Sequence, residues 1–163
     1  MNGAERYVTL LERAGCDAGV IAHSQAVHEV AIRYADRIPL ADRELVSAGA
    51  YLHDIGRGKT HTIQHAQVGA DYCRSIGLPE PVARIVECHT GAGLTADECT
   101  LLGLPPRDCV PATLEEKIVC NSDNLVAGAY PVSIERTICD AFFLPRHVRS
   151  RIFWLWLELE SYR

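Results

Sequence analysis

The sequence predicts an all-α protein made of a single helical domain. Its apolar residues recur mainly at the three- and four-residue spacing of amphipathic helices, and no segment alternates apolar and polar residues strongly enough to predict a sheet. The chain has 163 residues, the size of one ordinary domain. It contains no internal repeat, low-complexity tract or long linker, so we expect one domain over residues 1–163.

Glycine, proline and capping residues set the expected helix boundaries. The first helix should end before Gly15, and Asp17 suits the N-cap position of the second. The third should begin near Asp42 and stop at Gly56, which opens a loop that reaches residue 59. The expected helices cover residues 4–14, 18–36, 42–56, 63–76, 80–89, 96–102, 114–127, 134–143 and 146–162.

Two of these helices begin with the pattern of a capping box. Thr95 is followed three residues later by Glu98, and Thr113 is followed in the same way by Glu116. In this motif the hydroxyl and the carboxylate each accept a hydrogen bond from a backbone amide that the helix leaves without a partner. We therefore expect both helices to start at these threonines.

Charge and hydropathy disfavour a nucleic-acid partner, a membrane partner and secretion. The chain has 16 Lys and Arg against 21 Asp and Glu, a net charge of −5, which disfavours non-specific binding of long nucleic acids. No apolar run approaches the roughly 18 residues of a membrane span. The N-terminus lacks the basic start and apolar centre of a signal peptide. We expect a cytoplasmic protein with no membrane partner, although a local basic pocket for one phosphate is still allowed.

The seven cysteines do not predict disulfides or a zinc ribbon. They are odd in number, and no two are spaced as Cys-x-x-Cys. We expect reduced, mostly buried cysteines that pack as small apolar side chains.

The histidines fall in places that suggest chemistry. His53 and Asp54 are adjacent at the end of the third helix, and imidazole nitrogen with carboxylate oxygen suits zinc, iron or manganese. His61 and His65 are four residues apart, as in zinc proteases, but Thr62 stands where that motif needs a glutamate. This excludes the protease interpretation. We favour His65 as a ligand because it lies inside the helical pattern, and keep His61 as a weaker pocket candidate.

Other ligand-type residues have a structural alternative. His23 lies beside an apolar helix face, where a lone histidine is more often a hydrogen-bonded core residue than a ligand. His28 points about 140° away from it on the same helix, which favours a surface or structural role. Asp123 lies among apolar helical residues and needs a cation or a donor if it is buried. His89 ends the fifth helix.

The ordered set of these residues resembles the HD superfamily of metal-dependent phosphohydrolases. The string Leu52-His53-Asp54-Ile55-Gly56 resembles its His-Asp-Ile-Gly subgroup, and the stretch 65–70 with His89 resembles the members that hold two metals. The segments 57–61, 85–92 and 114–126 resemble a largely archaeal branch of this subgroup. The resemblance covers about residues 18–128, leaves C-terminal helices at about 134–162 outside it, and implies the helical bundle of the HD-domain type.

The resemblance implies a metal site. The implied ligands are His23, His53, Asp54, His65, His89 and Asp123. If a second metal is present, Asp54 would bridge the two ions, with His65 and His89 completing the second site. The implied cofactor is one or two divalent ions, and the ligand chemistry leaves Mn, Fe, Ni, Co, Zn and Mg open.

The implied activity is hydrolysis of a small phosphate ester by a metal-activated water. The expected substrate is a nucleotide or a related phosphomonoester or phosphodiester, and Asp54, Arg57 and Lys59 are the candidate catalytic residues. Arg57 departs from the family, in which many members carry lysine at this position. Arginine keeps the charge but does not donate a proton at neutral pH. Glu87 is a poor candidate for the general acid, because it points about 200° away from His89 on a helix.

Two other functions stay open. One is a regulatory module that binds a nucleotide or a metal without turnover, and the other is a helical interaction protein with incidental histidines. The last helix, with Trp154 and Trp156, is apolar on more than one side, so it is either a core helix or the surface of a homodimer. We expect truncation of either tryptophan to weaken stability or association far more than metal content.

Overall fold

The computed structural model describes residues 3–162 and confirms the all-α prediction. Over these residues the chain forms nine α-helices, one 3-10 helix and one small hairpin. The elements are α1 (Gly3–Ala14), α2 (Ala18–Arg37), α3 (Arg43–Leu52), the 3-10 helix η1 (Ile55–Gly58), α4 (His65–Ser75), α5 (Glu80–Cys88), α6 (Ala96–Leu101), α7 (Leu114–Asn124), β1 (Val126–Ala127), β2 (Tyr130–Pro131), α8 (Ile134–Asp140) and α9 (Arg146–Glu160).

The predicted helix starts are confirmed by their caps. The Asp17 carboxylate accepts a hydrogen bond from the Val20 amide at 2.9 Å, at the start of α2. Asp42 caps α3 in the same way. Both capping boxes, at the starts of α6 and α7, are present with their two reciprocal hydrogen bonds. These ends are correct because a cap depends only on residues close in sequence.

The third helix ends earlier than expected. It stops at Leu52, and the chain continues as the 3-10 helix η1 where a loop was predicted. At Gly56 a Cβ atom would collide with the backbone carbonyl of His65. The tighter path of η1 therefore depends on close packing of its backbone against α4, which helical periodicity does not report.

The seventh helix also ends early. It stops at Asn124 rather than residue 127, and β1 then pairs antiparallel with β2 in the register Val126 with Pro131 and Ala127 with Tyr130. Gly128 makes the turn with a φ of 60°, a conformation that favours glycine. The prediction of no sheet was wrong only for this two-residue hairpin, which is too short to show alternation.

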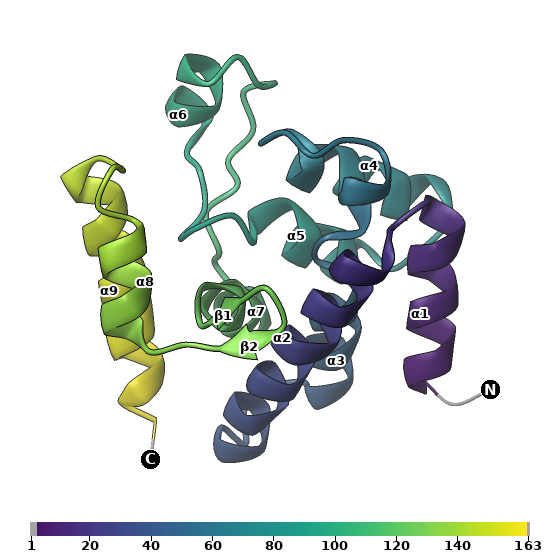
Figure 1. Cartoon of the computed structure of the whole chain (residues 1–163), viewed down its shortest axis with the longest axis horizontal. Coiled ribbons are helices and arrows are strands. Elements are labelled where there is room, and N and C mark those ends of the chain that lie inside the picture. Colours follow the sequence, from purple (N-terminus) through teal and green to yellow (C-terminus); the bar gives the residue numbers. More distant parts are fainter. Residues whose placement is uncertain (1–2, 163) are drawn as a thin grey trace.

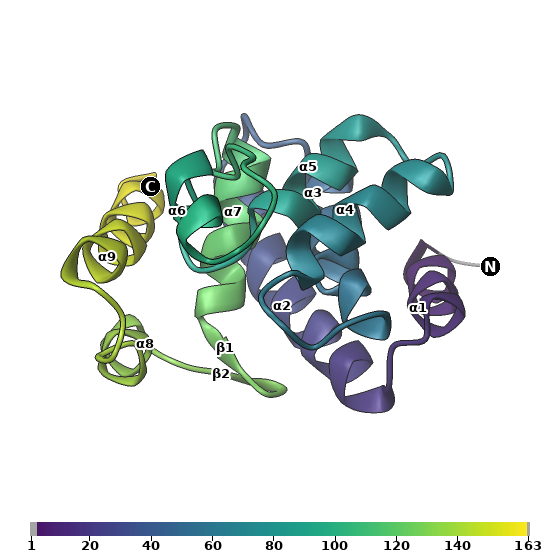
Figure 2. The ribbon, with the colours of Figure 1, turned by 90° about the horizontal axis from the view of Figure 1, so that it is seen from above.

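Helix α7 lies at the centre of the molecule (Figure 1). Helices α2, α3 and α5 pack on one side of it, and α9 packs on the other with α8 beside it. Seen from above, α1 and the α8–α9 pair lie at opposite ends of the long axis (Figure 2). The buried side chains follow this arrangement, since Val27 of α2, Ile118 of α7 and Leu159 of α9 belong to one apolar cluster.

The cysteine prediction is confirmed. All seven are free thiols, and six of them are buried. Burial raises the pKa of Cys73 to about 12, which keeps this thiol protonated and unreactive near neutral pH. The helices over residues 3–162 include none long and apolar enough to cross a bilayer.

Candidate metal centre

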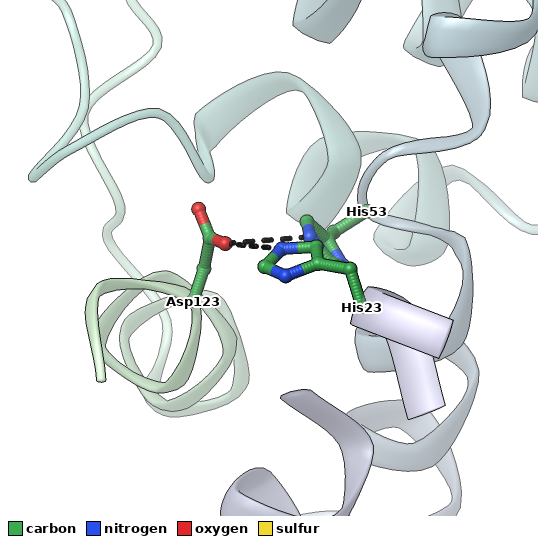
Figure 3. A group of neighbouring side chains, drawn as sticks. All are labelled: His23, His53 and Asp123. Carbon is green, nitrogen blue, oxygen red and sulfur yellow. Dashed lines mark hydrogen bonds and ion pairs between the residues drawn. The ribbon is translucent and has the colours of Figure 1, made fainter. Parts of the chain in front are cut away.

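The six ligand-type residues come from five helices and, apart from His23 in the second turn of α2, lie at or next to helix ends. His23 projects from α2, His53 and Asp54 follow the last residue of α3, and His65 is the first residue of α4. His89 follows α5, and Asp123 lies in the last turn of α7. Figure 3 shows His23, His53 and Asp123 pointing toward one another from three separate segments. Helix ends favour this arrangement because their side chains reach past the last turn into the space between neighbouring elements.

The first group of ligand atoms surrounds the Asp123 carboxylate. Its Oδ1 lies 2.9 Å from His23 Nε2 and 3.5 Å from His53 Nε2. These three atoms all lie within 4.8 Å of one another. Ligands about 2.0–2.2 Å from a divalent ion are separated by roughly 3–4 Å, so the group has the spacing of a coordination site.

The second group consists of His65 and His89 around the Asp54 carboxylate. One oxygen of this carboxylate faces these two rings, and the other faces the first group. Its Oδ1 lies 3.2 Å from His65 Nε2 and 3.4 Å from His89 Nε2. Its Oδ2 lies 3.8 Å from His53 Nε2 and 3.9 Å from His23 Nε2. The two oxygens of Asp54 therefore face different sets of imidazoles.

The four imidazole rings are oriented by the backbone. Each donates its Nδ1 hydrogen to a carbonyl oxygen, and the pairs are His23 with Gly128 at 2.7 Å, His53 with Ala50 at 2.8 Å, His65 with Thr62 at 2.8 Å and His89 with Val86 at 2.6 Å. A carbonyl only accepts, so the proton of the neutral ring is on Nδ1 and the lone pair of Nε2 faces the carboxylates. Metal-binding histidines are commonly fixed in this way.

The electrostatics of the cluster favour a positive charge at its centre. Burial opposes protonation of His53, but the charges of Asp54 and Asp123 outweigh it and raise the pKa of His53 to about 9. Burial also disfavours ionised Asp54 and Asp123, yet the surrounding imidazoles hold the pKa of both carboxyls well below its usual range. At His89 burial prevails and lowers the pKa. Without a metal ion, Arg57 and protons on the buried rings would have to balance the two carboxylates.

Two buried atoms of the cluster lack a hydrogen bond. They are His53 Nε2 and Asp54 Oδ1, and both belong to side chains that are almost fully buried. Leaving such atoms without a partner is costly, and each can serve as a metal ligand. The nitrogen and oxygen donors therefore fit a divalent cation.

The three other candidate residues lie at different distances from the cluster. Arg57 Nε donates to Asp54 Oδ2 at 2.9 Å, so its guanidinium borders the site. Lys59 is exposed, with its ammonium 5.3 Å from the centre of the Tyr72 ring. His61 is also exposed, and only its backbone carbonyl contacts Arg57. The structure brings Arg57, and neither Lys59 nor the His61 ring, into contact with the cluster.

Glu87 and His28 have structural contacts. The Glu87 carboxylate is buried and pairs with Arg74, Arg84 and Arg107. His28 Nε2 lies 3.0 Å from the Ser47 hydroxyl, and its ring stacks on Tyr51. Neither side chain reaches the cluster, in agreement with the roles expected for them.

Sequence reasoning missed the backbone groups that orient the rings. For His53, His65 and His89 the accepting carbonyl lies three residues earlier, which follows from their positions at helix ends. For His23 the acceptor is Gly128 in the turn between β1 and β2, more than a hundred residues away. A glycine in a short turn is a weak signal, and nothing local connects it to His23.

The chain belongs to the HD domain family, whose pattern it matches over residues 20–128. It is 45% identical over 138 residues to an uncharacterized protein of Methanocaldococcus jannaschii, a match that covers 82% of this chain and 81% of that protein. The predicted resemblance to this family is confirmed.

Some relatives are much longer than this chain. A tRNA (cytidine(56)-2'-O)-methyltransferase of Picrophilus torridus is 49% identical over 123 residues, which cover 76% of this chain and 36% of that protein. The chain thus spans about a third of that relative's length. A Ribonuclease Y of Frankia casuarinae is 34% identical over 94 residues, covering 55% of this chain and 14% of the relative.

Solved structures share the fold. The HD domain of the Listeria monocytogenes phosphodiesterase PgpH in complex with cyclic-di-AMP superposes with a TM-score of 0.60 at 19% identity, covering 90% of this chain and 92% of that one. A predicted HD superfamily hydrolase from an uncultured Thermotogales bacterium has a TM-score of 0.53 at 21% identity, covering 96% and 87%. At these identities the likeness shows the fold alone, and it confirms the HD-type helical bundle.

Proposed function

We propose that this protein is a metal-dependent phosphohydrolase that cleaves a small phosphate ester, a nucleotide or a related phosphomonoester or phosphodiester. The observation that carries the proposal is the inward-facing set of Nε2 lone pairs and carboxylate oxygens, whose mutual repulsion a shared divalent cation would relieve. Membership of the HD domain family and the fold shared with a phosphodiesterase support it.

The proposed ligands divide into two sites. His23, His53 and Asp123 would hold one divalent ion, and His65 with His89 the other, with Asp54 between them. A divalent ion held there would lower the pKa of a water toward about 7 and neutralise phosphoryl oxygens. The Nδ1 hydrogen bonds of the four rings would keep the ligand atoms in place during the reaction.

Arg57 is the proposed contact for the phosphoryl group. Its guanidinium is half-buried, borders Asp54, and has further N–H donors that suit phosphate oxygens. Lys59 is a second candidate, but its exposed ammonium would have to move from the Tyr72 ring to reach a substrate. Positive charge beside the transferring group is commonly a large contribution to phosphoryl-transfer catalysis.

The proposed substrate class rests on the relatives and on charge. The PgpH domain binds cyclic-di-AMP, and this supports a nucleotide-like substrate. The net charge of −5 disfavours long nucleic acids. We do not extend methyltransferase activity to this chain, because it spans only about a third of the relative that carries that name.

The test is hydrolysis by purified protein loaded separately with Mn, Fe, Co, Ni, Zn or Mg. The panel contains p-nitrophenyl phosphate, bis-p-nitrophenyl phosphate, nucleoside monophosphates and cyclic dinucleotides. We expect metal-dependent release of product with at least one ester, loss of activity and metal in His53→Ala, and neither loss in His147→Ala, which removes an exposed histidine of α9. Tight nucleotide binding without turnover would favour the regulatory alternative. Full metal content in His53→Ala would reject the site.

A further inference from the structure

A cleft opens beside the candidate metal centre, on the side that faces α8 and α9. It has a volume of about 340 Å³, within the range of small-molecule sites. Asp123 lines it together with Phe143, which lies in the segment between α8 and α9. The cleft therefore connects a proposed metal ligand with helices that lie beyond residues 20–128, the part that matches the HD domain family.

Hydrogen bonds tie the walls of this cleft to one another. The Asn124 side-chain amide donates to the Gly91 carbonyl, which joins the end of α7 to the segment after His89. The Thr137 hydroxyl donates to the Asn124 carbonyl, which joins α8 to α7. Ile152 of α9 is buried and also lines the cleft. A site with fixed walls loses less entropy when a ligand binds.

The lining of the cleft offers no cationic partner for a second phosphate. Among the described residues that line it, the ionisable ones are Asp123 and Asp140, both acidic, and no lysine, arginine or histidine is present. Asp140 is itself paired with Arg136 at 2.7 Å. Most of the remaining lining is apolar, including Val132, Leu144 and Ile152. Such a cleft suits an uncharged group, because an anion there would lose its water without gaining a cationic partner.

Phe143 provides an exposed aromatic side chain in the lining of the cleft. Its side chain is 83% exposed, while the preceding residue, Phe142, is 76% exposed and lies under the Arg149 guanidinium outside the cleft lining. An exposed aromatic ring beside a binding site is suited to stacking on a flat group, and stacking on nucleobases tolerates all four bases.

We propose that this cleft binds the nucleoside part of a substrate that has one phosphate group, with the base stacked on Phe143 and the phosphate at the His/Asp cluster. This inference rests on the proposed function and specifies its substrate class. It assigns substrate selection to α8 and α9, which the family match does not include.

The test measures binding, so it does not depend on turnover. The probes are the non-hydrolysable phosphonate analogues of the four ribonucleoside monophosphates, with methylphosphonate as the fragment that lacks a nucleoside. Their dissociation constants are measured by calorimetry on the Mn-loaded wild type, on Phe143→Ala, and on the matched control Phe142→Ala. Phe143→Tyr keeps an aromatic ring and serves as the rescue variant.

We expect at least one nucleoside phosphonate to bind about tenfold or more tightly than methylphosphonate. Phe143→Ala should weaken the binding of that nucleoside phosphonate at least about fivefold, whereas Phe142→Ala should weaken it less than about twofold. Phe143→Tyr should bind it about as tightly as the wild type does. Equal affinity of all probes, absence of nucleoside phosphonate binding, or equal effects of the two alanine variants would overturn the inference. Nucleoside-dependent binding without hydrolysis of any ester would instead reject the proposed turnover and leave the cleft as a nucleotide-binding site.

Discussion

The Nε2 atoms of His65 and His89 lie 3.0 Å apart, and each ring donates its Nδ1 hydrogen to a carbonyl three residues earlier. In their neutral forms both rings therefore direct lone pairs at each other and at Asp54 Oδ1, 3.2 and 3.4 Å away. Three acceptors at this spacing repel one another unless a proton or a metal ion lies among them. This relationship underlies the first prediction.

Removing one of these rings should remove one ion. We expect His65→Ala to lower the metal content from about two ions per chain to about one, because His23, His53 and Asp123 still supply a complete group. Elemental analysis of the purified variant gives the stoichiometry. His61→Ala is the matched control, since that ring is exposed and should leave the metal content unchanged. Unchanged metal in His65→Ala would show that the second site does not exist.

The arginine that borders Asp54 should matter for turnover. We expect Arg57→Ala to lower kcat about a hundredfold on the best ester of the panel, because it removes a positive charge beside the transferring group. Arg57→Lys should recover part of this loss, since lysine keeps the charge without the forked donor geometry. Lys59→Ala should have the smaller effect, because Lys59 is exposed and lies against Tyr72. Equal kcat values for Arg57→Ala and Lys59→Ala would contradict this ranking.

The packing of η1 on α4 should not tolerate a side chain at Gly56. We expect Gly56→Ala to reduce the free energy of unfolding by about 3 kcal/mol, because its Cβ would collide with the His65 carbonyl and displace a proposed ligand. Chemical denaturation measures the loss, and elemental analysis should show reduced metal. Gly3→Ala is the control, since a Cβ there meets nothing within 4 Å. Wild-type stability of Gly56→Ala would mean that the two backbones lie further apart.

Truncation of the two tryptophans of α9 should reduce the free energy of unfolding by different amounts. Trp156 is half-buried against the apolar core, so we expect Trp156→Ala to lower the free energy of unfolding by about 2 kcal/mol. Trp154 is 63% exposed, and its truncation should cost less than about 1 kcal/mol. Both variants should keep their metal. Light scattering on the same samples tests association, and a dimer that Trp154→Ala dissociates would identify this face as the homodimer surface.

The ion pair between Glu98 of α6 and Arg151 of α9 should weaken in acid. Burial alone would raise the pKa of Glu98, but the hydrogen bond from the Thr95 amide and the pairing with Arg151 outweigh it and lower the pKa to about 2. Because the pKa of Glu98 is lower in the folded state, its ionised form stabilises the protein fully at pH values above its unfolded pKa of about 4.5. This contribution disappears as the pH falls toward 2. The stability difference between wild type and Glu98→Gln should shrink over that interval in urea titrations.

A double-mutant cycle checks the cause of this pH dependence. In an Arg151→Ala background, Glu98→Gln should cost less and its pH dependence should be weaker, because the ion pair at 2.9 Å is already absent. Equal costs in both backgrounds would assign the effect to the capping box alone.

Much of the local structure could be predicted from the sequence. The starts of α2, α6 and α7 follow from Asp17, Thr95 and Thr113, since a cap involves only residues a few positions apart. Helical periodicity also predicted the all-α class correctly, because it too depends on residues three or four positions apart. The ligand types and their order along the chain were also readable, and they indicated the family before any geometry was known.

Tertiary contacts decided what periodicity does not encode. The end of α3 depends on how closely η1 approaches α4 at Gly56, and the tautomer of His23 depends on the carbonyl of Gly128. His23 and Asp123 are 100 residues apart, yet their ligand atoms lie 2.9 Å from each other. The cleft at Phe143 likewise exists only because α8 and α9 pack beside the end of α7. Local propensities fix where helices begin, whereas the distance between two helices depends on how all the buried side chains fit together.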